Sequence, residues 1–149
     1  MAENSIREQI IAQVVSELEN IDGINVVQRT LPMFDQLKEF PSTVFPLAVV
    51  VGGLPKPVTK RTGRTGHVDH LTSQLTIDVN VYFVNSGDPD TLISNLADDI
   101  WIKLWTDQTK GGLVRQSEVE FLTNPVHWEP FIAFKMRNTV TYEHDTGGI

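Results

Sequence analysis

The sequence feature that most constrains the fold is a run of alternating apolar residues between Leu71 and Phe83, which only Ser73 interrupts. A period of two is that of a β-strand, so one face of this strand is buried and the other can meet water or a partner. The run is also much longer than the about 5–6 residues of a usual strand. Strands of this length tend to bend or to extend a sheet into a neighbouring subunit. The pattern therefore favours a protein that works as a building block.

Two segments have the apolar period of amphipathic helices. The first is predicted from about Ile6 to Asn20, because apolar residues recur four apart and Ser5 and Glu8 have the spacing of a capping box. The second starts at Asp88 and Pro89, an N-cap residue followed by a residue suited to the first helical position. Its stripe consists of Leu92, Leu96, Ile100 and Leu104.

Four shorter segments are predicted strands. The apolar run Leu47–Val51 does not alternate, so we expect both of its faces to be covered. Ile24–Thr30 forms a short strand before it, and Glu118–Thr123 and Ile132–Tyr142 form a pair after the second helix. The first of this pair can resume at Val126, and Pro125 and Pro130 confine the segment between the two to an edge or a turn.

This order of elements predicts an α+β fold in one domain over residues 1–149. The expected architecture is an antiparallel or mixed sheet with a long central strand, two amphipathic helices packed on it and a C-terminal hairpin. A length of 149 residues is enough for one such core.

The segment Leu54–His70 is predicted to be one long flexible loop, because it is rich in proline and glycine and poor in apolar residues. Four cations stand in it although the chain has a net charge of -7: Lys56, Lys60, Arg61 and Arg64. They are candidate partner-binding residues, which would order on an acidic partner or touch DNA phosphates. The alternative is a solvated tip, and the sequence favours neither.

The strongest candidate metal site is the sequence His67-Val68-Asp69-His70. Imidazole and carboxylate ligands suit zinc or iron, and a small metal-dependent hydrolase using His67, Asp69 and His70 is the alternative function from another class. A solvated loop is the favoured interpretation. The chain has no cysteine and no phosphate-binding or nucleophile-elbow motif. We therefore expect a protein that is not an enzyme, with no catalytic or metal-binding residues and no cofactor.

Three tryptophans are candidate interface anchors. Trp101 adjoins the apolar stripe of the second helix and is expected in the core, whereas Trp105 and Trp128 are not assigned. The acidic balance, with a pI of about 4.9, argues against a general nucleic-acid binder. The longest apolar run is too short to cross a membrane, so we expect a protein that is cytosolic when made and has no membrane partner.

In this order of elements the chain resembles the tail terminator proteins of long-tailed bacteriophages of the lambda-like type. The resemblance covers about Ser5 to Glu143. It depends on the helix near Ser5-Ile6-Arg7, the stretch Phe45-Pro46-Leu47-Ala48-Val49-Val50, the long strand around Gln74–Val79, the helix start Asp88-Pro89-Asp90 and the closing Val140-Thr141-Tyr142-Glu143.

The resemblance implies a structural virion protein that forms a ring, usually a hexamer, on the end of the tail tube. Such a ring ends tube polymerisation and provides the interface for head attachment. The implied partners are other copies of the chain, the major tail tube protein and a head-completion or neck protein. Genomic DNA would pass through the lumen without specific binding. The implied location is the head-proximal end of the tail, after assembly in the host cytoplasm. A head–tail joining protein is the alternative within this class.

Overall fold

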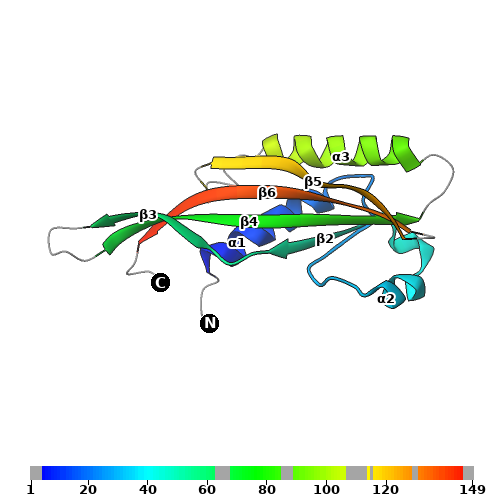
Figure 1. The fold of residues 1–149 in the computed structure, drawn as a ribbon, viewed down its shortest axis with the longest axis horizontal. Coiled ribbons are helices and arrows are strands. Elements are labelled where there is room, and N and C mark those ends of the chain that lie inside the picture. Colours follow the sequence, from blue (N-terminus) through cyan, green and yellow to red (C-terminus); the bar gives the residue numbers. More distant parts are fainter. Residues whose placement is uncertain are drawn as a thin grey trace.

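The alternating segment lies within β4 (Val68–Val84), the central strand of a mixed sheet in the computed structural model (Figure 1). The structure describes residues 5–62, 68–84, 89–106, 114, 116–128 and 131–145. Within these ranges the strand order is β1–β2–β4–β6–β5, and β3 also pairs with β4. The other strands are β1 (Val26–Gln28), β2 (Leu47–Gly52), β3 (Lys56–Thr62), β5 (Gln116–Trp128) and β6 (Phe131–Asp145). The predicted α+β class with a long central strand is confirmed.

Both predicted helices are present. α1 (Ile6–Glu19) begins after Ser5, whose hydroxyl accepts a hydrogen bond of 3.1 Å from the Glu8 N–H. α3 (Pro89–Thr106) begins at the proline expected in its first position, and the proposed cap Asp88 lies outside the described residues. A short helix, α2 (Phe34–Glu39), and a 3-10 turn at Ser42–Val44 precede β2.

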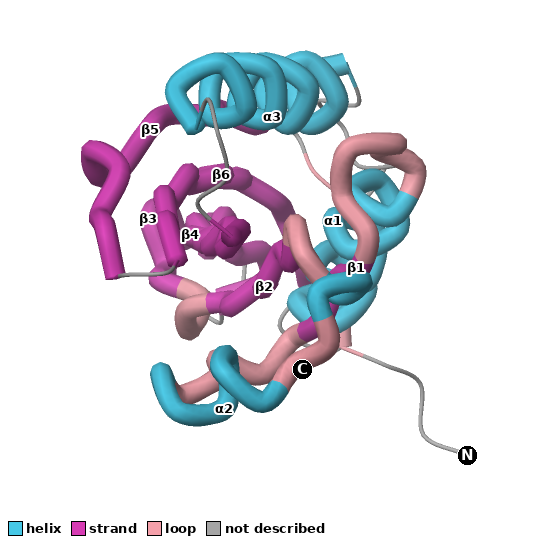
Figure 2. Tube along the Cα trace, turned by 90° about the vertical axis from the view of Figure 1, so that its right-hand side faces the viewer, coloured by secondary structure: helices cyan, strands magenta, loops and turns pink. Residues whose placement is uncertain are grey.

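The main core lies between one face of the sheet and the helices α1 and α3. α1 packs against β1 and β2, α3 packs against β5 and β6, and the two helices contact each other. Figure 2 shows the curled sheet end-on, with α1 and α3 beside it and α2 on another side. The predicted buried face of β4 is confirmed, since Leu75, Ile77, Val79 and Val81 are fully buried in this core.

A smaller core covers part of the opposite face. It contains Leu37 of α2 and Phe45, which precedes β2. The strands contribute Leu47 and Val49 of β2, Tyr82 of β4 and Phe131 of β6. Together with Ala48 and Val50 in the main core, this confirms that β2 is covered on both faces. Thr76 and Asp78 are half-buried, as the alternation predicts. Asn80 was expected to be more exposed but is only 9% exposed, since it lies opposite Val49 beside the smaller core.

The C-terminal hairpin is also confirmed. β5 and β6 are antiparallel, and β5 is the last strand of the sheet order. Its pairing shifts register between Phe121 and Thr123 and again between Thr123 and Val126. The second shift spans Pro125, which has no N–H to give to a ladder and was predicted to occupy an edge or a turn.

The prediction of one loop over Leu54–His70 was wrong for most of that segment. β3 occupies Lys56–Thr62 and β4 begins at Val68, so only Leu54, Pro55 and the undescribed residues 63–67 remain between strands. The error has a physical cause. This strand contains cations and Pro57 and lacks an apolar alternation, and it owes its conformation to pairing with β4 rather than to local preference.

Candidate functional site

β3 and the part of β4 that it pairs with, Val68–Gln74, are called the strand arm, and β6 pairs with the other side of β4 from His70 onward. β3 continues the line of β2 along the same side of β4, after a break at Gly53, Leu54 and Pro55. The arm lies at one end of the long axis of the molecule, beyond both α1 and α3 (Figure 1). With 7 residues, β3 spans about 23 Å at a rise of 3.3 Å per residue. The arm thus projects past the helices that cover the main core.

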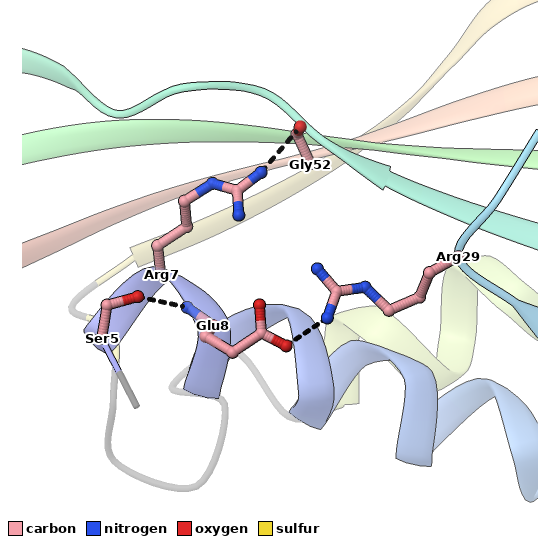
Figure 3. Close-up of polar contacts among 5 residues, drawn as sticks. All are labelled: Ser5, Arg7, Glu8, Arg29 and Gly52. Carbon is pink, nitrogen blue, oxygen red and sulfur yellow. Dashed lines mark hydrogen bonds and ion pairs between the residues drawn. The ribbon is translucent and has the colours of Figure 1, made fainter. Parts of the chain in front are cut away.

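Arg7 connects helix α1 to the break between β2 and β3 (Figure 3). Its Nε donates to the Gly53 carbonyl at 2.9 Å and its Nη2 donates to the Gly52 carbonyl at 3.0 Å. The Gly53 N–H in turn donates to the Thr76 carbonyl at 2.8 Å. One guanidinium therefore satisfies two carbonyls at the base of the strand arm. These contacts hold the end of β2 and the residue after it against α1.

The next residue of α1 has a different role. The Glu8 carboxylate contacts Arg29 in an exposed ion pair (Figure 3). The hydrogen bond from Arg29 lowers the pKa of the Glu8 carboxyl below its usual value. The Ser5 half of the predicted capping box is confirmed, while the Glu8 side chain is directed to Arg29.

Three of the four candidate partner-binding cations lie on the strand arm. Lys56 is exposed at the start of β3, Lys60 and Arg61 follow on the same strand, and Arg64 lies outside the described residues. Among the described strands β3 pairs only with β4, so no described strand lies along its other edge. Cations on an open edge protect it against indiscriminate strand pairing and leave it suited to an acidic partner. The sequence identified these residues but not the strand on which they lie.

The structure describes only part of the proposed metal-binding cluster. Asp69 and His70 lie in β4, and His70 is opposite Arg61 on one side and Asp145 on the other. His67 lies outside the described residues. Within the residues that the structure places, no group of three His, Cys, Asp or Glu side chains could hold a metal ion.

A pair of tryptophans on the outer side of α3 forms a second candidate surface. The rings of Trp101 and Trp105 are stacked, with centroids 5.6 Å apart and planes 8° from parallel. Trp101 is 39% exposed, Ile102 50% and Trp105 49%, and we call these three residues the tryptophan face. The expectation that Trp101 belongs to the core was wrong, because it lies one residue past Ile100 and that step of about 100° turns it away from the sheet. Trp128 lies in β5.

The polar pairs that the structure shows inside the sheet have structural roles. Arg137 donates to both carboxylate oxygens of Asp78 across β4 and β6, at 2.8 and 3.3 Å, and this hydrogen bonding raises the pKa of the guanidinium. Asn138 is fully buried, and its Nδ2 donates to the Ser117 hydroxyl at 2.7 Å and to the Glu118 carbonyl at 2.9 Å. These contacts join neighbouring strands. The candidate functional surfaces are therefore the strand arm and the tryptophan face.

Searches against protein-family models and against curated proteins find no match for this chain. None of the helices in the described ranges has both the length and the apolar character needed to span a membrane. The strand arm and the tryptophan face are therefore the features of the molecule that bear on its function.

Proposed function

We propose that this protein is a structural virion subunit that forms a ring on the end of a phage tail tube, ends tube polymerisation and provides the interface for head attachment. The observation that carries the proposal is the strand arm. It extends past α1 and α3, and the main core formed by the described side chains of β4 begins at Leu75. β3 contributes no described side chain to either core and contains three cations, so its natural use is contact with another chain.

The charge of the protein supports a ring with an open lumen. The chain has a net charge of -7, and exposed acidic residues lie on β5, among them Glu118 and Glu120. An acidic lumen would repel DNA phosphates, so the genome would pass without binding. Within this proposal the other partners are the tube protein on one side of the ring and a head-completion protein on the other.

Mass measurement in solution tests ring formation directly. We expect a monomer at low concentration and a closed ring, usually a hexamer, at high concentration, measured by sedimentation velocity and checked by electron microscopy of negatively stained particles. Subunits aligned on a tube end would associate at a lower bulk concentration, because the template raises their effective concentration. A dimer that does not change with concentration would contradict the ring, because a two-fold pair leaves no free surface for a cyclic neighbour.

A genetic experiment separates tube capping from head joining. In a phage that encodes the protein, disruption of the gene should give headless tails whose tubes exceed the normal length. Loss of a joining protein would instead leave headless tails of normal length. Tube lengths measured by electron microscopy, with the gene restored from a plasmid as the control, decide between the two.

A further inference from the structure

The C-terminal half of α3 is apolar on two sides. Ile100 and Leu104 face the main core and are fully buried, while the tryptophan face lies on the outer side and is exposed. Exposed apolar side chains that gather in one patch mark an interaction surface more often than single exposed ones do. Tryptophan is also the residue most enriched among the dominant contacts of protein interfaces. The outer side of α3 is thus a candidate surface for contact with another chain.

The charges around the tryptophan face indicate the charge of the chain that would bind there. Asp98 precedes Trp101 by one helical turn and is exposed, and Asp99 beside it is exposed too. A partner of positive charge is therefore favoured, and lysine or arginine side chains also bind the faces of tryptophan rings. On this acidic chain, β3 is a strand that contains three cations, Lys56, Lys60 and Arg61, and no acidic residue.

The two surfaces lie on different parts of the molecule, so a contact between them joins different copies. The strand arm lies at one end of the long axis, and α3 lies along a side of the sheet (Figures 1 and 2). When the arm and the α3 of one copy contact two different neighbours, the contact is heterologous, and each added subunit leaves a free arm at one end and a free α3 at the other until a ring closes. We propose that the strand arm of one copy lies across the tryptophan face of the next copy. This inference rests on the ring of the proposed function and names the contact that builds it.

The first test removes the tryptophan face. The double variant W101A/W105A should fold normally, because both side chains are exposed, and should raise the concentration at half assembly by roughly tenfold or more. The matched control is S94A/N95A, which changes two exposed residues of the same helix. It should assemble as the wild type does. Sedimentation velocity measures assembly, and circular dichroism verifies the fold. Rings that form at the wild-type concentration in W101A/W105A would overturn the proposed contact.

The second test exchanges the charges. D98K/D99K and K56D/K60D/R61D should each weaken assembly, because each places like charges in the contact. The variant that combines all five substitutions should recover assembly, since opposite charges again face each other with their signs reversed. A simple change in net charge does not predict that recovery. If the combined variant assembles no better than the two parents, the contact is wrong.

The outcomes separate the two proposals. If the wild type forms no rings at any concentration or on tube ends, the proposed function fails and the contact with it. If rings form and neither set of variants alters them, only the contact fails. Normal rings of W101A/W105A that no longer join heads or tubes would assign the tryptophan face to another virion protein and would likewise overturn the contact between copies.

Discussion

At the scale of one side chain, a substitution of Val79 tests which face of β4 is buried. It is fully buried in the main core, so Val79→Asp would place a charge there without a partner. We expect a loss of about 3 kcal/mol or more in the free energy of unfolding. Chemical denaturation of this variant beside Gln74→Asp, an exposed position on the same strand, provides the comparison. Equal stability of the two variants would show that the assigned face is wrong.

The tyrosines provide an optical test of burial. The chain has two, Tyr82 in the smaller core and Tyr142 in the main core, and burial raises the pKa of both phenols. Because the folded pKa exceeds the unfolded one, this contribution to stability is complete below the unfolded pKa of about 10 and is lost as pH rises through the folded pKa. Tyrosinate absorbance should therefore appear at higher pH in the native protein than in denaturant. Coincident titrations would contradict the burial.

At the scale of elements, the contact between α1 and the base of the strand arm depends on Arg7. Arg7→Ala leaves the Gly52 and Gly53 carbonyls without their donor and should cost about 1–3 kcal/mol. Arg7→Lys keeps the positive charge but cannot donate from two nitrogens at once, so it should recover only part of the lost stability.

Arg29→Ala is the matched control, because it removes another arginine contact of the first turn of α1. That ion pair with Glu8 is exposed and should contribute less than about 1 kcal/mol. Thermal unfolding of the three variants measures the difference. An Arg7→Ala variant no less stable than Arg29→Ala would mean that the arm base does not depend on this guanidinium.

At the scale of the whole molecule, the arm should be separable from the fold. Thr59 and Thr72 are paired, so replacing residues 60–71 by Asn-Gly closes the hairpin with a two-residue turn. The described side chains of both cores lie outside the removed segment. We expect a folded monomer, with a melting temperature within about 5 °C of the wild type, that no longer forms rings. Ring formation at the wild-type concentration would exclude the arm as an assembly element.

Much of the fold could be predicted from local patterns. The alternation in β4 and in Ile132–Tyr142 determined which side chains face the core, and the four-residue stripes determined both long helices. Ser5 and Pro89 marked where these helices begin. Such features depend on residues close in sequence, because a strand repeats every two residues and a helix every 3.6. The sequence therefore determined these elements and their buried faces.

The candidate site was decided by tertiary structure. β3 has no apolar period of its own and becomes a strand by pairing with β4. The sequence therefore indicated its cations but predicted that they lie in a loop. Trp101 adjoins an apolar stripe, yet the position of α3 against β5 and β6 leaves it outside. The partner of a strand and the side of a helix that is covered both depend on residues far apart in the chain. Such contacts leave no periodic pattern in the local sequence. The sequence alone thus determined the core and the candidate residues, while tertiary packing decided which surfaces remain for a partner.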